Sequence, residues 1–182
     1  MRITGGRYRG RRIVPARGLK ARPTTDLARE SLFNILGNTV DFPSAVVLDM
    51  FSGTGSISFE FASRGAMVHL VEIDRLNFAG IKKVIGEIGF ANIKPVHIDA
   101  RAYLKICTFR YDIVFADPPY NLKWLDKIPE LVFGAEILKD NGIFILEHPK
   151  TVSFADSKWF TDHRHYGGVN FSFFSPAAGR DQ

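Results

Sequence analysis

The chain has 182 residues, which suits one domain with a core large enough to be stable without cross-links. Its 46% hydrophobic and 24% charged residues are typical of a globular protein, and a single cysteine, Cys107, excludes an internal disulfide framework. No apolar run approaches the ~18 residues of a membrane span. We therefore expect a cytoplasmic protein with no membrane partner.

The net charge of +5 is unevenly distributed along the chain. Residues 1–22 carry eight basic side chains and no acidic one, whereas the rest carries 16 basic and 19 acidic side chains. We therefore expect two parts, a basic arm over residues 1–22 and a globular domain over residues 23–182. The arm favours a polyanionic partner such as RNA, and a solubilising tail is the alternative.

The arm interleaves its arginines with apolar residues and glycines. Arg7 to Ile13 can form short strands around a turn, a hairpin that would present arginines to phosphates and Tyr8 to a base. The residues expected to contact RNA are Arg7, Tyr8, Arg9, Arg11, Arg12 and Arg22.

A helix is predicted directly after the arm. Thr24 or Thr25 can cap it, and Asp26 suits the positive end of its dipole. Apolar residues then recur at helical spacing: Ala28, Leu32, Ile35 and Leu36. Gly37 is a natural stop.

From residue 45 onward, strand and helix patterns alternate. Strands are predicted at 45–49, 67–73, 93–98, 111–116, 142–147, 159–166 and 169–174, and helices at 56–64, 76–88, 100–106 and 124–138. The last two strands flank Gly167-Gly168 and form a hairpin. This order predicts an α/β, Rossmann-like, doubly wound fold, with a mostly parallel seven-stranded sheet and an antiparallel C-terminal edge strand.

The first predicted strand ends at Asp49, which opens the glycine loop 49–55. Ser58 stands where the dinucleotide fingerprint has its third glycine, and no phosphate-binding lysine follows. A carboxylate here would oppose a pyrophosphate, but it would favour a cationic ligand such as a sulfonium that carries an α-amino group. A solvated turn aspartate is the alternative.

Two further acids follow the next predicted strands. Glu72 lies 19 residues after Gly53, where an acid can bind both hydroxyls of a ribose. Its neighbour Asp74 is expected mainly to cap the following helix. Asp99 can accept a hydrogen bond from an adenine amino group, or it can cap the helix after the third strand.

The fourth predicted strand ends in Asp117-Pro118-Pro119-Tyr120. An amino group on an aromatic base is a poor nucleophile, and acceptors outside the base plane stabilise it as it becomes tetrahedral. The Asp117 carboxylate and the Pro118 carbonyl can be those acceptors, and Tyr120 can stack on the base. The alternative is a turn that contains a tyrosine.

The whole chain resembles the bacterial small-subunit ribosomal RNA guanine-N2 methyltransferase family. The resemblance rests on Ile3-Thr4-Gly5-Gly6, on Arg22-Pro23-Thr24-Thr25-Asp26-x-x-Arg29-Glu30-x-Leu32-Phe33-Asn34 and on the tetrapeptide 117–120. It implies methyl transfer from S-adenosyl-L-methionine to the exocyclic N2 of a guanine in small-subunit rRNA, with an assembled or partly assembled 30S particle as the substrate.

The resemblance also assigns roles to individual residues. The loop 49–55 would hold the methionine part of the cofactor, Glu72 the ribose, Asp99 and Ala100 the adenine, and the tetrapeptide the guanine. Thr24 and Thr25 would close over the cofactor. The expected cofactor-binding residues are Thr24, Thr25, Asp49, Phe51, Ser52, Gly53, Thr54, Gly55, Glu72, Ile73, Asp74, Asp99 and Ala100, and the expected catalytic residues are Asp117, Pro118, Pro119 and Tyr120.

Two other functions stay open on the sequence. The tetrapeptide chemistry also suits an adenine-N6 or cytosine-N4 methyltransferase of DNA or RNA, and a non-catalytic RNA-binding module can keep the same fold. His163 and His165 share a strand face, but no cysteine or acid cluster lies near them and we expect no metal site. His148-Pro149-Lys150 follows the fifth strand and either contacts RNA or turns the chain.

Overall fold

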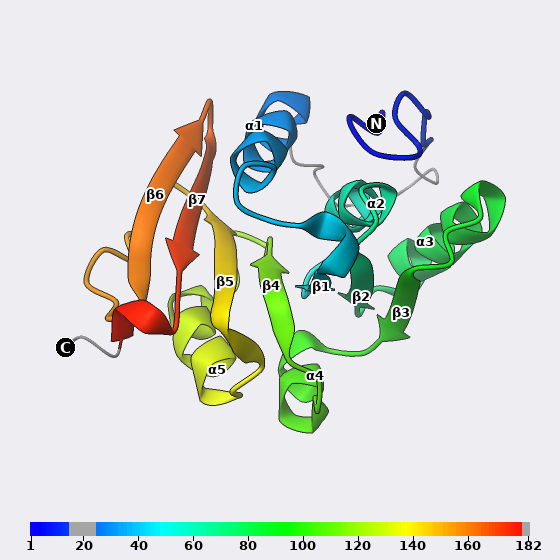
Figure 1. Ribbon diagram of the computed structural model, residues 1–182. Helices are drawn as coiled ribbons and strands as arrows, with labels where there is room; N and C mark the ends of the chain where they lie inside the picture. The colour runs from blue at the N-terminus through cyan, green and yellow to red at the C-terminus, as the bar shows by residue number, and fades with distance from the viewer. Residues whose placement is uncertain (15–24, 180–182) are drawn as a thin grey trace.

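The sheet of the computed structural model runs in the order β3-β2-β1-β4-β5-β7-β6 (Figure 1). The structure describes residues 1–14 and 25–179. The strands are β1 (Val46–Asp49), β2 (Met67–Glu72), β3 (Ile93–His97), β4 (Tyr111–Ala116), β5 (Leu138–His148), β6 (Phe160–Tyr166) and β7 (Val169–Phe174). The helices are α1 (Asp26–Leu36), α2 (Ser56–Ser63), α3 (Arg75–Ile88), α4 (Ala100–Ile106) and α5 (Ile128–Gly134), with 3-10 turns η1 (Phe42–Ser44), η2 (Leu125–Lys127) and η3 (Ala177–Gly179).

Five adjacent strands are parallel, and the chain order reverses at their centre. β1 pairs with β2 on one side and with β4 on the other. β7 runs antiparallel to both β5 and β6, so the predicted antiparallel edge is present as a hairpin in which β6 is the outermost strand. The predicted doubly wound, mostly parallel seven-stranded sheet is confirmed.

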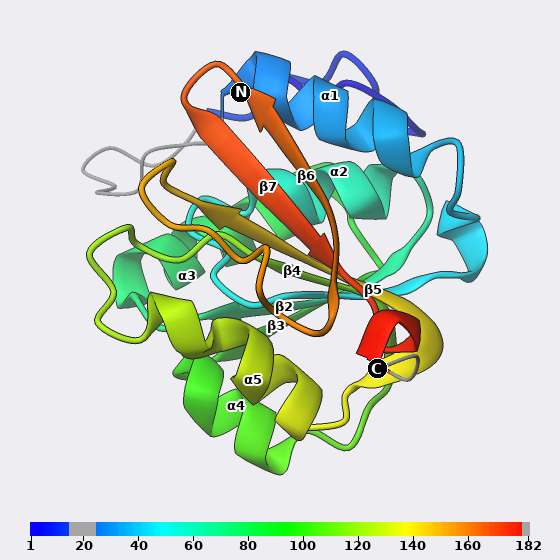
Figure 2. The same ribbon diagram turned by 90° about the vertical axis from the view of Figure 1, so that its left-hand side faces the viewer.

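The helices cover both faces of the sheet, as Figure 2 shows with α1 and α2 above it and α4 and α5 below. Successive residues of a strand point to opposite faces. On β4, Ile113 and Phe115 therefore join the core beneath α1, α2 and α3, whereas Val114 and Ala116 join the core of α4 and α5. No helix in the described ranges has the length and apolar character needed to cross a membrane.

The helix α1 begins where its sequence predicts. Thr25 is the N-cap, and its side-chain oxygen accepts a hydrogen bond from the Ala28 nitrogen at 3.2 Å. The apolar stripe faces the core, since Ala28, Leu32 and Leu36 are buried. The other predicted cap, Thr24, lies outside the described residues.

The prediction of one helix over residues 124–138 is wrong. The structure has the short 3-10 turn η2 and then α5, which ends at Gly134. Pro129 in the first turn of α5 has no N–H to continue a helix from the preceding turn. Glu136 then adopts a left-handed backbone with φ 52°, which reverses the chain into β5.

The prediction of a hairpin within residues 7–13 is wrong in its pairing. The segment 10–13 pairs instead with the first three residues. Ile3 exchanges hydrogen bonds with this segment, to the Arg11 carbonyl at 3.0 Å and from the Gly10 nitrogen at 2.8 Å. Ile3 and Ile13 are buried in the core beneath α1 and α2. The start of the arm is therefore packed into the domain rather than appended to it.

A buried carboxylate, Glu60 of α2, joins the arm to α1. The Thr4 nitrogen and hydroxyl both donate to it at 2.9 Å, and the Arg29 Nε donates at 3.1 Å. Arg64 also pairs with Glu60, and Arg29 Nη2 pairs with Asp26 at 2.8 Å and donates to the Arg2 carbonyl at 3.0 Å. Glu60 is fully buried and Arg29 is 1% exposed, so neither charge has water as an alternative partner.

Because breaking a buried ion pair leaves a buried charge without its partner, and the other acid paired with Arg29, Asp26, is 70% exposed, Glu60→Gln should lower the free energy of unfolding by roughly 3–5 kcal/mol. Chemical denaturation measures this loss. The matched control is Glu87→Gln, which removes an exposed i,i+4 partner of Lys83 on α3 and should cost less than about 0.5 kcal/mol. Equal losses in the two variants would contradict a stabilising role for the Glu60 cluster.

Candidate active site

The four acids singled out in the sequence end four adjacent strands. Asp99 follows β3, Glu72 ends β2, Asp49 ends β1 and Asp117 follows β4. Because these strands are parallel, all four acids lie at the same edge of the sheet. The tertiary structure thus brings these four predicted acids together at one edge of the sheet.

The glycine loop after β1 is fixed by both neighbouring strands. The Met50 nitrogen donates to the Phe115 carbonyl of β4 at 2.9 Å, and the Ser52 nitrogen donates to the Val71 carbonyl of β2 at 3.1 Å. Gly55 has φ 79°, and a Cβ on it would lie 2.8 Å from the Phe59 ring. The loop therefore requires glycine there for its conformation and for its packing against α2.

Asp49 is a buried carboxylate with one uncommitted oxygen. Its side chain is 1% exposed, and Oδ2 accepts a hydrogen bond from the Ser58 hydroxyl at 2.6 Å. Its Oδ1 is buried with no hydrogen-bond partner in the described ranges. Burial raises the pKa of Asp49 to about 7. A cationic ligand would supply the missing partner.

Ser58 is a site residue that the sequence analysis missed. It was noted only as the absent third glycine of a dinucleotide fingerprint. In the structure it lies in the first turn of α2, with its hydroxyl on Asp49.

Glu72 connects the second strand to the glycine loop. Its Oε2 accepts from the Gly53 nitrogen at 2.7 Å, and its Oε1 accepts from the Asp74 nitrogen at 2.6 Å. Burial raises the pKa of Glu72. Each carboxylate oxygen keeps a second lone pair, so this geometry leaves acceptors for two hydroxyl groups.

Both predicted helix caps are present. Asp74 caps α3 by accepting from the Leu76 and Asn77 nitrogens at 2.9 and 2.8 Å. Asp99 caps α4, and both of its capping bonds are to Oδ1. Its Oδ2 has no hydrogen-bond partner among the described residues, so capping does not occupy the whole carboxylate.

Three of the remaining predicted cofactor residues lie next to these acids or to the glycine loop. Ile73 is 62% exposed at the tip of β2, where an apolar surface can contact a base. Ala100 is buried in the first turn of α4. The Phe51 ring lies 5.9 Å from the Trp124 ring, which connects the glycine loop to the segment after the tetrapeptide.

The tetrapeptide turns sharply out of β4. Pro118 is buried, whereas Pro119 and Tyr120 are exposed, and the Leu122 nitrogen closes the turn on the Pro119 carbonyl at 2.9 Å. The Tyr120 hydroxyl donates to the Glu147 carboxylate of β5 at 3.2 Å. Tyr120 therefore has a fixed hydroxyl and an exposed ring, as a stacking platform requires.

Glu147 is the second site residue that the sequence analysis missed. The sequence contained a signal for it, because Glu147 lies at the end of a fifth parallel strand. The four acids singled out in the sequence lie at the ends of the other four parallel strands. Its side chain is buried, and it belongs to the strand next to β4.

The proposed RNA-contacting residues divide into two groups. Arg7, Arg9, Arg11 and Arg12 are exposed. Tyr8 is half-buried, with its ring 4.7 Å from the Phe90 ring and its hydroxyl donating to the Gly89 carbonyl. Arg22 lies outside the described residues. In the ranges 1–14 and 25–179, no group of three or more His, Cys, Asp or Glu side chains is arranged to hold a metal ion.

A central parallel sheet of this strand order, with acids at four strand tips and the tetrapeptide beside the glycine loop, defines the class I methyltransferases. The chain belongs to the family described as conserved hypothetical protein 95, whose model matches residues 1–175. Relatives named ribosomal RNA small subunit methyltransferase D agree with the predicted resemblance, and the chain is a methyltransferase.

Three known proteins illustrate the similarity. The ribosomal RNA small subunit methyltransferase D of Escherichia coli K12 is 34% identical over 148 residues, which are 81% of this chain and 74% of that protein. The tRNA (guanine(10)-N2)-dimethyltransferase of Methanocaldococcus jannaschii is 30% identical over 119 residues, 59% of this chain and 33% of that protein. The solved structure of the Escherichia coli protein yhhF superposes with a TM-score of 0.83 and 30% identity over 96% of each chain.

The raised pKa of Asp49 predicts a pH dependence of stability. Between about pH 4 and pH 7 the folded state holds a proton that the unfolded state has lost, so the free energy of unfolding should fall as pH rises through this range. Asp49→Asn removes the change with pH that Asp49 causes in the free energy of unfolding. This change amounts to at most about 4 kcal/mol.

Denaturation of both proteins at pH 5 and pH 8 measures the difference. Glu72 contributes in the same direction, but it is present in both proteins and cancels in the comparison. Identical pH profiles for wild type and Asp49→Asn would contradict a protonated Asp49.

Proposed function

We propose that this protein transfers a methyl group from S-adenosyl-L-methionine to the exocyclic N2 of a guanine in small-subunit ribosomal RNA. One observation carries the proposal: β1 and β4 lie side by side, so the buried Asp49 and the tetrapeptide 117–120 end neighbouring strands. The end of β1, where Asp49 would bind a cationic group, thus lies beside the end of β4, where the tetrapeptide would bind a flat base. The rRNA substrate is supported by the Escherichia coli relative.

The residues present fit this cofactor. The uncommitted Oδ1 of Asp49 suits a cationic amino acid group, and Glu72 has acceptors for two ribose hydroxyls. Asp99 Oδ2 is an acceptor for an amino group, and Ile73 supplies apolar contact for the adenine. The cofactor supplies an electrophilic methyl group on a positively charged sulfur.

Asp117 and Pro118 act on the guanine. The Asp117 carboxylate and the Pro118 carbonyl accept hydrogen bonds from the N2 amino group, which directs the nitrogen lone pair out of the ring plane. The nitrogen would accept the methyl group as the bond from that methyl to the sulfonium breaks, with the sulfur leaving as a neutral thioether, and the Asp117 carboxylate would accept the proton that the nitrogen loses. Tyr120 fixes the base plane by stacking. Positioning and electrostatic stabilisation therefore supply most of the rate enhancement.

The choice of guanine N2 rests on similarity more than on geometry. The tetrapeptide chemistry serves any exocyclic amino group, including adenine N6 and cytosine N4. Guanine N2 is supported by the predicted resemblance and by the archaeal relative, which is named a guanine-N2 enzyme. Mass spectrometry of nucleosides from rRNA treated with the protein distinguishes the three products.

The exposed arginines of the arm are proposed to bind RNA phosphates. The arm contacts Glu60 and Ser63 on α2, a helix of eight residues that starts at the glycine loop. Such a helix is about 12 Å long, so an RNA strand on the arm lies within reach of the site.

We propose that the substrate is an assembled or partly assembled 30S particle in the cytoplasm.

Replacing the catalytic acid should separate chemistry from cofactor binding. Asp117→Ala should bind S-adenosyl-L-methionine with nearly wild-type affinity and lose methyl transfer by about 10²- to 10³-fold, because in the proposed mechanism this carboxylate acts on the amino group of the base and not on the cofactor. Calorimetry and a radiolabelled methyl assay give the two values. The control Asp126→Ala removes an exposed acid of η2 and should retain activity. Normal turnover in Asp117→Ala would remove Asp117 from the mechanism.

Neutralising the arm should weaken RNA binding through its electrostatic part. Because Ile3 and Ile13 are in the core, substitution is preferable to deletion, and Arg7→Gln, Arg9→Gln and Arg11→Gln are combined. Losing three phosphate contacts should reduce the slope of log affinity against log salt by about 2 and leave cofactor affinity unchanged.

A triple variant on other surfaces is the control for the arm. Lys105→Gln, Lys127→Gln and Lys158→Gln remove the same charge from exposed positions on α4, in η2 and before β6. An equal loss of RNA affinity in the two triple variants would show that net charge, and not the arm, is responsible.

A further inference from the structure

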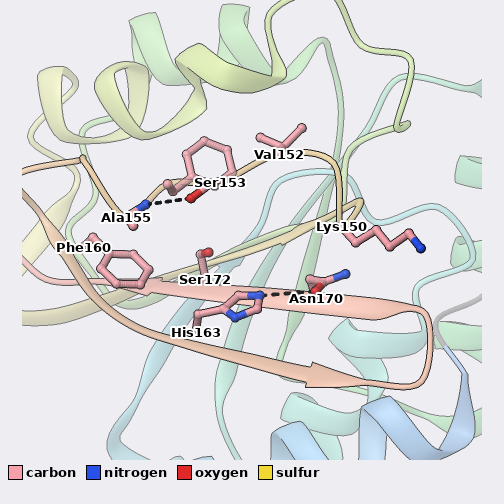
Figure 3. A pocket seen from close by; sticks show the side chains of 9 residues that line it. Lys150, Val152, Ser153, Ala155, Phe160, His163, Asn170 and Ser172 are labelled. Carbon is pink, nitrogen blue, oxygen red and sulfur yellow. Dashed lines mark hydrogen bonds between the residues drawn. The ribbon is translucent and has the colours of Figure 1, made fainter.

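The C-terminal hairpin encloses a pocket that the mechanism above does not use. It has a volume of about 240 Å³ and lies between β6, β7 and the segment that follows β5 (Figure 3). Residues of three kinds line it, namely the polar His163, Asn170 and Ser172, the aromatic Phe154 and Phe160, and Lys150. We call it the hairpin pocket.

The hairpin pocket lies in the same cross-sheet row as the tetrapeptide. Ala116, the residue before Asp117, is level with Leu146 of β5, which pairs with Ser172 of β7. Ser172 pairs in turn with His163 of β6. Neighbouring strands lie about 4.8 Å apart, so β7 is roughly 10 Å from β4 along this row. Stacked nucleotides are spaced by about 3.4 Å, so that distance corresponds to about three of them, and to fewer in a stretched strand.

His148 holds the Ser172 hydroxyl of the pocket as a hydrogen-bond acceptor. The His148 Nδ1 donates to the Pro149 carbonyl at 3.0 Å, and burial lowers the pKa of His148, which favours the neutral ring. Its Nε2 therefore accepts the hydroxyl proton of Ser172 at 2.8 Å. Ser172 is left with oxygen lone pairs only.

The Asn170 side-chain amide is held as a hydrogen-bond donor. The Asn170 Oδ1 accepts from the His163 Nε2 at 3.2 Å, as the dashed line in Figure 3 shows. The Asn170 amide nitrogen has no hydrogen-bond partner in the described part of the chain. Asn170 and Ser172 are two residues apart on β7 and so share a face of the sheet. Ser172 is 1% exposed and supports the pocket from below, so the polar group that the pocket offers to a ligand is the Asn170 amide donor.

The other lining residues complete the features of a nucleotide site. The partly buried Phe160 supplies aromatic surface on which a base can stack, whereas Phe154 is only 7% exposed. Lys150 is exposed and lies at the Asn170 end of the pocket, with its ammonium group directed outward (Figure 3). This is a suitable position for a backbone phosphate. The volume is below the 300 to 1,000 Å³ of drug-sized sites and suits a single base.

We propose that the hairpin pocket binds the base of a nucleotide close to the methylated guanine in the same RNA strand. The inference rests on the proposed function, because it requires an RNA whose target base occupies the tetrapeptide. The RNA would then run along the sheet edge, with the cofactor on one side of the target guanine and the neighbouring base on the other. The Asn170 amide would select that base by an acceptor on its hydrogen-bonding edge.

Asn170→Asp tests the pocket with little change in shape. The aspartate keeps an oxygen for His163 but replaces the free amide donor with an acceptor. The KM for RNA should rise about 10-fold, whereas kcat and the Kd for S-adenosyl-L-methionine should change by less than about twofold. The matched control is Asn141→Asp, the same substitution at an exposed position near the start of β5, which should leave all three constants unchanged.

Abasic substitutions show whether Asn170 and an RNA base contact each other. Single abasic nucleotides are placed at each position flanking the methylated guanine, in rRNA fragments or in particles reconstituted with them. For wild type, one abasic position should raise the KM about 10-fold, and for Asn170→Asp that position should have no further effect, because both changes remove the same contact. Multiplicative effects at every position would overturn the inference and leave the proposed function intact.

Failure of the proposed function gives a different result. If wild type methylates no rRNA, the substrate assignment fails, and binding of AMP, GMP, CMP and UMP followed by NMR then tests the pocket alone. Shifts of the His163 and Asn170 signals that Asn170→Asp abolishes would support a nucleotide site. Absence of shifts with all four nucleotides would overturn it.

Discussion

The pairing of β1 with β4 is the constraint on which the rest of the site depends. These strands are separated by more than 60 residues, yet Asp49 pairs with Phe115, and the Met50 nitrogen donates to the Phe115 carbonyl at 2.9 Å. At this point the chain order of the sheet reverses, so connections leave on both faces and the strand tips remain open. The glycine loop and the tetrapeptide emerge there side by side. Methyl donor and acceptor can meet only because this junction is fixed.

The buried Glu60 has a corresponding role for the N-terminal arm. It binds Thr4 of the arm and Arg29 of α1 from a position within α2, and Arg29 in turn binds the Arg2 carbonyl. The presence of arginine at position 29, in the motif on which the family resemblance rests, is thus explained by its contacts to Glu60 and to the arm. The arm arginines are held on the domain, so the RNA that we propose they bind is aligned with the sheet edge rather than tethered loosely to it.

Function along the sheet edge follows the strand order. In the proposed function, the tips from β3 to β4 offer acceptors for an adenine, a ribose, a cationic amino acid group and a base amino group. Beyond β4, the Tyr120 to Glu147 hydrogen bond fixes the stacking platform, and the hairpin pocket continues the same row. In these proposals the strand order relates cofactor, target base and neighbouring nucleotide, with the first four subsites about one strand apart and the hairpin pocket two strands beyond β4.

The sequence by itself determined the alternation of strands and helices, the acids at the strand tips, the helix caps and the charge of the arm. These features depend on local periodicity and on neighbours a few residues away. It did not determine the arm's pairing partners, the burial of Glu60, the Ser58 contact to Asp49 or the pairing of Ser172 with His163. Those were decided by the tertiary structure, because each requires two distant segments to meet, and no short pattern records which segments those are.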